Sequence, residues 1–200
     1  MSEYHFSAPV AEEEIRKLRV GDIIYYDGII VTGRDAVHDR VVNGGISFPV
    51  DARGGALYHA GPIVKKRGEG YELVAAGPTT SMRMEKCERE FIEKTGVRII
   101  IGKGGMGNNT ADACREFGAV HAVFPGGCAV LAANHVEEVL GVEWDDLGMP
   151  EAVWVLRVKD FGPLVVSIDS CGGNMFESRK KATETKRDLA LEKFFGITDR

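Results

Sequence analysis

The spacing of hydrophobic positions changes at about Pro78. Before it, apolar residues come in short runs between glycine-rich turns, which predicts a β-rich lobe over residues 21–76 after an N-terminal helical arm over residues 1–20. After it, short apolar runs alternate with stretches of helical spacing, which predicts a mainly parallel α/β layer over residues 77–175. A C-terminal helix over residues 176–200 completes the chain. We expect one α/β domain in which the lobe packs on the layer.

The same pattern predicts individual elements. Three acids begin a short helix within residues 10–18, and Asp27-Gly28 between two apolar runs predicts a hairpin turn. Gly96 is expected to end a helix over residues 82–95. The later segments are expected to form a strand at 97–101, a helix at 110–118, a strand at 119–123, a helix at 128–141, two strands within 152–169 and an amphipathic helix at 176–196.

Composition excludes several classes of protein. The 200 residues carry a net charge of −5 without a basic stripe, which argues against nucleic acid as a partner. No apolar run approaches the ~20 residues of a membrane-spanning helix, and the acidic N-terminus does not look like a signal peptide, so a cytoplasmic location is expected. The four cysteines form no C-x-x-C pair, so no local metal motif can be identified.

Candidate chemistry is concentrated in two segments, GPTTSMRM at residues 77–84 and GKGGMGNNT at residues 102–110. They place Arg83 and Lys103 beside glycine-rich turns, and TGRDAVH earlier in the chain adds Arg34. Such cations can hold a small polyanion, because Arg binds carboxylates bidentately and Lys acts as a point charge. The hydroxyl side chains of the first segment are Thr79, Thr80 and Ser81.

Each of these features also has a simpler structural explanation. The glycine loop before residues 110–118 can present backbone N–H groups to an anion, or glycine can serve only the turn. One hydroxyl of Thr79, Thr80 and Ser81 can cap the following helix. Arg34 and His38 share a face if that segment is helical, and the simpler explanation is a turn capped by Asp35 with Arg34 at the surface. The remaining histidines of interest, His59 and His121, are more typical of a protein core than of a ligand set, and Cys171 has no neighbouring base.

Taken together, TGRDAVH, GGALYHAGP, GPTTSMRM, IIIGKGGM and VKDFGPLVVSID resemble the β subunit of the two-subunit iron–sulfur fumarate hydratases (class I) and of the related L(+)-tartrate dehydratases. The resemblance covers nearly the whole chain. It implies a swivelling β/β/α domain that closes over a partner. It also implies a hydro-lyase that interconverts fumarate and L-malate and is active only with an α subunit.

The resemblance further implies roles for individual residues. Arg34, Arg83, Lys103 and Gly104 would bind the substrate carboxylates, and Thr79, assisted by Lys103, would act as the catalytic base. The [4Fe–4S] cluster would belong to the α subunit, in a complex of two α and two β chains, with no metal bound by this chain. Tartrate or a methylated fumarate is the alternative substrate, and a non-catalytic anion-binding module is the alternative from another class.

Overall fold

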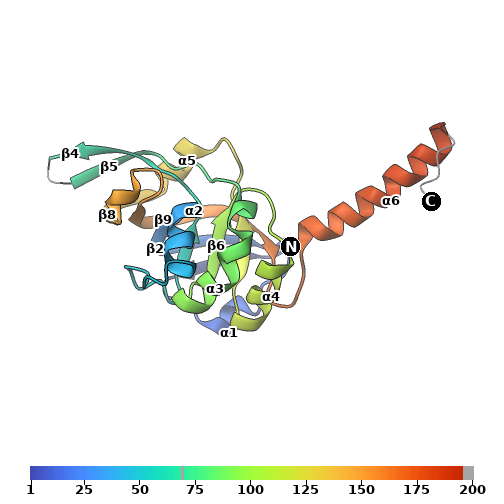
Figure 1. The fold of residues 1–200 in the computed structure, drawn as a ribbon, viewed down its shortest axis with the longest axis horizontal. Coiled ribbons are helices and arrows are strands. Elements are labelled where there is room, and N and C mark those ends of the chain that lie inside the picture. The colour runs from blue at the N-terminus through green and yellow to red at the C-terminus, as the bar shows by residue number, and fades with distance from the viewer. Residues whose placement is uncertain (69, 196–200) are drawn as a thin grey trace.

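The computed structural model describes residues 1–68 and 70–195, and its centre is a seven-stranded sheet (Figure 1). The strand order is β1-β2-β3-β6-β7-β9-β8, and the first five strands run parallel. The strands are β1 (Glu3–Ser7), β2 (Ile23–Thr32), β3 (Ala56–Tyr58), β6 (Ile99–Gly102), β7 (Val120–Val123), β8 (Val136–Glu143) and β9 (Val153–Ile168). The expected mixed α/β fold with a mainly parallel sheet is therefore present.

The sheet closes on itself, because the long antiparallel strand β9 pairs with both β7 and β2. Strands β2, β3, β6, β7 and β9 thereby form a ring of hydrogen-bonded neighbours. One face of these strands points inward, where Tyr26, Tyr58 and Phe161 are fully or almost fully buried. The opposite face carries Leu57 and Ile100, which pack under the helices. Both faces of the parallel strands are thus buried, which explains their continuous apolar runs.

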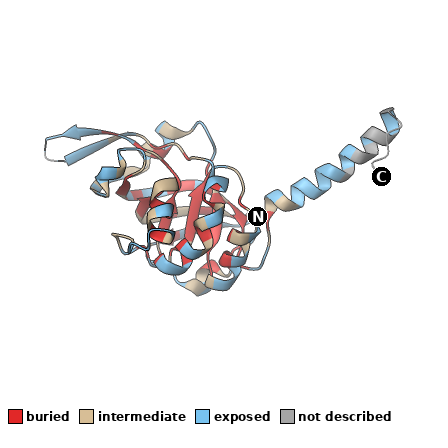
Figure 2. Cartoon of the chain, in the orientation of Figure 1, coloured by how far each residue is buried: buried red, intermediate tan, exposed pale blue. Residues whose placement is uncertain are grey.

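Helices α2, α3 and α4 cover the outer face of the sheet (Figure 1), where Val37, Phe91 and Ala113 pack in the same core cluster as Leu57 and Ile100. Helices α3 and α4 end at Gly96 and Gly118, both in the left-handed conformation, as the sequence predicted for these two ends. The helices are α1 (Glu12–Ile15), α2 (Asp35–Val42), the 3-10 turn η1 (Ser81–Arg83), α3 (Glu85–Thr95), α4 (Asn108–Phe117), α5 (Ala129–Asn134), the 3-10 turn η2 (Asp145–Leu147) and α6 (Met175–Phe195). Figure 2 shows buried residues on the strands of the sheet and on the helices that cover it.

The first half of the chain differs from the expectation of a helical arm and a separate lobe. Residues 3–7 form strand β1, and the arm keeps only the single turn α1. Strands β2 and β3 belong to the central sheet, so that only the hairpin of β4 (Ile63–Arg67) and β5 (Gly70–Ala75) stands apart from it. The prediction of a hairpin turn at Asp27-Gly28 is wrong, because strand β2 continues through Gly28. A Cβ at Gly28 would lie 2.7 Å from the Ala8 side chain, so glycine lets the two segments approach.

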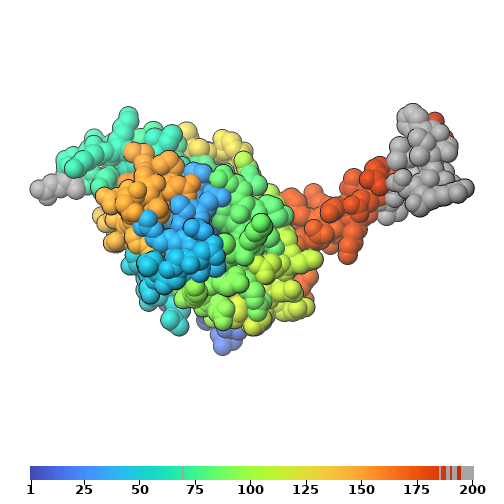
Figure 3. Space-filling model, in the orientation of Figure 1, coloured from blue at the N-terminus to red at the C-terminus, as the bar shows by residue number. Residues whose placement is uncertain are grey.

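Two further elements differ in the second half. The predicted helix over 128–141 ends at Asn134, and its remainder is strand β8, paired with β9. The two strands expected within 152–169 are the single strand β9. Helix α6 projects from the body (Figure 3), and its sequence does not gather apolar residues on one face, so it is not the expected amphipathic helix. Residues 196–200 of that prediction lie outside the described residues.

Candidate active site

The parallel strands end at one edge of the sheet, where their loops are joined by backbone hydrogen bonds. His59, the first residue after β3, accepts a hydrogen bond from the Thr79 N–H (2.6 Å), and the Thr79 carbonyl accepts one from the Lys103 N–H (2.9 Å). The Ser81 N–H in turn donates to the Lys103 carbonyl (3.0 Å). The carboxyl edge of a parallel sheet is where α/β proteins bind ligands. The structure therefore brings together Thr79 and Lys103, which the sequence analysis selected.

The two arginines lie at the same edge but are paired with carboxylates of the chain itself. The Arg34 guanidinium contacts Glu151 (3.0 Å), and the Arg83 guanidinium contacts Asp35 (2.7 Å), the residue that begins α2 directly after Arg34. These ion pairs fix both guanidiniums at the N-terminal end of α2. The Lys103 ammonium is exposed and has no ion pair with any residue that the structure describes. Gly104 follows it in the left-handed conformation (φ 77°).

The three hydroxyl side chains do not cap a helix, so the capping explanation is wrong for this segment. Thr80 precedes η1 and Met84 precedes α3, and neither helix start receives a side-chain hydrogen bond from these residues. Thr79 is half-buried, and within the described part of the chain its hydroxyl forms no hydrogen bond. Ser81 is fully buried between two imidazoles. Of the three hydroxyls, that of Thr79 is therefore the one that is half-buried and has no hydrogen bond within the described part of the chain.

The glycine loop before α4 does not offer its helix N-terminus to a ligand, because the Glu85 carboxylate occupies it. Glu85 accepts hydrogen bonds from the N–H groups of Gly107 (2.8 Å) and Asn109 (3.0 Å) and from the Thr110 hydroxyl (2.6 Å). The positive end of the helix dipole is thus neutralised by the chain itself. Glu85 therefore occupies the N–H groups at the start of α4, whereas those of Gly104 and Gly105, earlier in the loop and next to Lys103, are not among its donors.

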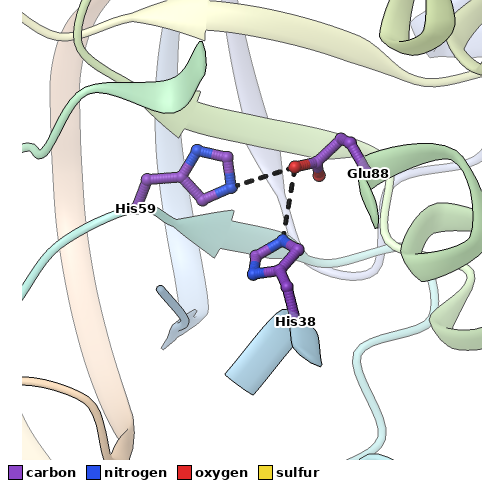
Figure 4. Close-up of side chains that lie close together, drawn as sticks. All are labelled: His38, His59 and Glu88. Carbon is purple, nitrogen blue, oxygen red and sulfur yellow. Dashed lines mark ion pairs between the residues drawn. The ribbon is translucent and has the colours of Figure 1, made fainter. Parts of the chain in front are cut away.

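Behind this edge lies a chain of buried polar side chains that the sequence analysis did not identify. The Ser81 hydroxyl lies 3.0 Å from His59 Nδ1 and 3.0 Å from His121 Nε2. His121 Nδ1 lies 2.6 Å from the Ser167 hydroxyl. On the other side, the Glu88 carboxylate lies 3.3 Å from Nε2 of both His59 and His38 (Figure 4).

One sequence signal could have revealed this array. Glu88 lies between Met84 and Phe91 on the apolar face of the predicted helix over residues 82–95, where a charged side chain requires a buried partner. The histidines gave no comparable signal, because a single His in an apolar stretch is common in protein cores.

Burial sets the ionisation of these groups. Burial lowers the pKa of His121 to about 3, and it lowers the pKa of His59 although the Glu88 carboxylate acts in the opposite direction. The pKa of Glu88 lies below its usual range although burial raises it, because His59 and His38 lower it in their protonated forms. Burial favours the neutral forms of His59 and His121 near pH 7.

These shifts predict that the protein loses stability as the pH falls. The pKa of an unfolded His is near 6.5, so above that pH His121 is neutral in both the folded and the unfolded state, and its stabilising contribution is fully present. As the pH falls from 6.5 towards about 3, the unfolded chain binds a proton that the folded protein does not, and that contribution to stability is lost. One such group changes the free energy of unfolding by about 1.4 kcal/mol per pH unit within this window. Urea unfolding between pH 7 and pH 5 should show a shallower pH dependence for His121→Gln than for the exposed control His5→Gln. Equal slopes would contradict the prediction.

The cysteines do not form a site for an iron–sulfur cluster among the described residues. Cys114 is buried, Cys87 and Cys128 are half-buried, and Cys171 is exposed. None of them belongs to a group of three or more metal-ligating side chains in the described part of the chain. The residues present therefore do not fit a cluster held by this chain. Among the helices described, none combines the length and the apolar character needed to cross a bilayer.

Comparison with known proteins places this arrangement in a family. Residues 2–179 match the family described as Fumarase C-terminus. The L(+)-tartrate dehydratase subunit beta of Escherichia coli K12 is 52% identical over 93% of this chain and 92% of its own length. A Geobacillus stearothermophilus protein named "Putative fumarate hydratase class I" is 43% identical over 94% of this chain, which corresponds to 36% of that longer protein. The chain therefore belongs to the fumarase C-terminus family, together with β subunits of tartrate dehydratase and a class I fumarate hydratase homologue.

Proposed function

We propose that this chain is the β subunit of a two-subunit hydro-lyase that removes water from a four-carbon 2-hydroxydicarboxylate. The observation that supports this most directly is the strand edge where Thr79 and Lys103 are joined by backbone hydrogen bonds, with Arg34 and Arg83 nearby. Such an edge offers cations for carboxylates and a hydroxyl for proton transfer. The 52% identity to a tartrate dehydratase β subunit supports the same reaction class.

Dehydration needs a base that removes a proton from the carbon beside a carboxylate, and a Lewis acid that takes the hydroxide. In this chain we assign the base to Thr79, whose hydroxyl is free, and substrate binding to Arg34, Arg83, Lys103 and Gly104. Lys103 provides the positive charge that lowers the cost of deprotonating the Thr79 hydroxyl. A substrate carboxylate can bind Arg34 or Arg83 by replacing the Glu151 or Asp35 carboxylate, so these acids hold the guanidiniums in place before substrate arrives.

The Lewis acid is proposed to belong to a partner. Because the described cysteines are not gathered, we assign a [4Fe–4S] cluster to an α subunit, where its iron would supply the Lewis acidity. The complete site then forms only where the two subunits meet, in a complex of two α and two β chains. In this proposal the β subunit moves as a unit, in the manner of a swivelling domain, to close over the cluster.

We propose L-tartrate as the first substrate and fumarate with L-malate as the second. The tartrate assignment is supported by the relative at 52% identity, and the fumarate assignment by the class I fumarate hydratase homologue at 43%. L-Tartrate and L-malate differ by one hydroxyl group, a difference that the hydrogen-bonding groups of a pocket can discriminate strongly.

The test is an anaerobic assay of tartrate dehydration and fumarate hydration, first with this chain alone and then with a reconstituted iron–sulfur α subunit. Activity only in the mixture is the expected result, and the ratio of kcat/KM values ranks the two substrates. Full activity of the chain alone would overturn the interfacial site. A complex that forms but acts on neither substrate would contradict the proposed reaction and favour a non-catalytic anion-binding module.

Lys103→Ala should impair both binding and turnover in the assembled enzyme. A charge-assisted hydrogen bond to a carboxylate contributes about 1.5–3 kcal/mol, so KM is expected to rise about ten- to a hundredfold. Turnover should fall as well, because the Thr79 hydroxyl loses its neighbouring cation. Lys86→Ala, at an exposed position on α3, is the matched control. An unchanged KM for Lys103→Ala would remove Lys103 from substrate binding.

A further inference from the structure

Three buried side chains from separate elements converge behind the candidate active site. His38 comes from α2, His59 follows β3 and Glu88 comes from α3, and Figure 4 shows all three directed at a common point. Their exposed fractions are 1%, 0% and 0%. The ligand atoms, two Nε2 atoms and a carboxylate oxygen, all lie within 4.8 Å of one another. Such complete burial of three polar groups requires a specific partner for each.

The distances within this group do not correspond to hydrogen bonds. Each Nε2 lies 3.3 Å from the Glu88 carboxylate, whereas a charge-assisted hydrogen bond is about 2.7–2.9 Å long. Among the described residues, no hydrogen-bond partner is found for either Nε2 atom or for either oxygen of the Glu88 carboxylate. By contrast, zinc bonds of about 2.0–2.1 Å at tetrahedral angles place neighbouring ligand atoms about 3.3–3.4 Å apart. The two Nε2-to-carboxylate distances are therefore those of neighbouring ligands around a metal ion.

The hydrogen bond made by His38 Nδ1 determines whether His38 Nε2 carries a proton. His38 Nδ1 lies 2.8 Å from the backbone carbonyl of Arg34, which can only accept, so Nδ1 carries the proton. In a neutral imidazole Nε2 then presents a lone pair towards Glu88. A metal-bound histidine characteristically donates its other N–H to a carbonyl in this way.

The protonation state of His59 follows from the chain of hydrogen bonds through Ser81, His121 and Ser167. The Ser167 hydroxyl donates to the His121 carbonyl (3.2 Å), so His121 Nδ1 donates to Ser167 (2.6 Å). His121 Nε2 then accepts the proton of the Ser81 hydroxyl, and the Ser81 oxygen accepts the Nδ1–H of His59. With every hydrogen bond satisfied, His59 Nε2 also presents a lone pair towards Glu88.

We propose that His38, His59 and Glu88 bind one divalent first-row transition-metal ion. Two imidazoles and a carboxylate form a donor set that suits zinc or iron. The ion would join α2, the end of β3 and α3, and would thereby hold the backbone at Arg34 and at Thr79, which bonds to the His59 carbonyl. This differs from the expectation that the chain binds no metal, and it does not depend on the proposed reaction.

The test uses the full chain stripped with a chelator and titrated with Zn²⁺ by calorimetry and with Co²⁺ by visible absorption. We expect one equivalent of metal per chain and a Co²⁺ spectrum without thiolate bands, which excludes the cysteines as ligands. Glu88→Gln keeps the shape and removes the charge, and it should weaken zinc binding at least tenfold. Glu90→Gln, at an exposed position on the same helix, is the matched control and should bind as the wild type.

Zinc binding that is equally tight in Glu88→Gln, or no stoichiometric binding by the wild type, would overturn the proposal. If Glu88→Gln does not fold, histidine NMR of the wild type decides. The Nε2 resonances of His38 and His59 should shift on addition of zinc. A proton that stays on His38 Nε2 in the presence of zinc would show a simple ion pair with Glu88 and would overturn the metal site.

Discussion

Thr79→Ala is expected to lower kcat of the assembled enzyme by about 10²–10⁴-fold with little change in KM, because a positioned proton-transfer group contributes about that much to the rate. Thr79 is joined to Lys103 by a backbone hydrogen bond at the strand edge, and its hydroxyl forms no hydrogen bond with another described residue. Removing it takes away a reacting group and leaves the carboxylate-binding cations in place. The measurement is steady-state kinetics with the α subunit present, for both tartrate and fumarate.

Thr80→Ala is the matched control, since Thr80 has the same side chain at the neighbouring, exposed position. It should retain most of the turnover. Wild-type kcat in Thr79→Ala would move the base to another group, and a selective loss in Thr80→Ala would assign it to Thr80. Ser81→Ala gives a third comparison, because its buried hydroxyl is committed to two imidazoles.

Gly102→Ala should destabilise the fold by about 1–3 kcal/mol, the usual cost of forcing an extra methyl group into a packed interior. A Cβ at Gly102 would overlap the Ser81 hydroxyl and lie 3.2 Å from His59 Nδ1. The displaced Ser81 segment includes Thr79, so turnover should fall together with stability. Urea unfolding measures the first effect, and the reconstituted assay measures the second.

The matched control for this substitution is Gly141→Ala on β8, where a Cβ would meet no atom within 4 Å. Its free energy of unfolding should stay close to that of the wild type. Equal stabilities for Gly102→Ala and Gly141→Ala would show that the Ser81 segment can move aside, and would contradict the tight packing on which the prediction depends.

Local sequence was sufficient for several elements and for the location of the site. The apolar run before GKGGM gave strand β6, and Gly96 and Gly118 gave the ends of α3 and α4. The family resemblance assigned Thr79 and Lys103 to one site, and a backbone hydrogen bond joins these two residues. These features depend on residues that are close along the chain, where periodicity and backbone preference act directly.

Other elements depended on partners that are distant in sequence. Strand β2 continues through Asp27-Gly28 because β9 pairs with it on both sides of this dipeptide, with a register shift between Tyr26 and Gly28, and this pairing outweighs the local preference for a turn. Residues after Asn134 form β8 for the same reason, since β9 supplies their hydrogen bonds. Helical spacing in that segment could not reveal a strand partner found more than ten residues later.

The sequence by itself determined the α/β class, the family resemblance and the cations with the hydroxyl of the candidate site. Only the tertiary structure decided that Glu85 fills the N-terminus of α4, and that His38, His59 and Glu88 converge in a buried group. The physical reason is that hydrogen-bond partners and burial are set by segments that folding brings together from distant parts of the chain. A pattern within one segment records which face is apolar, but it does not record which polar groups will meet there.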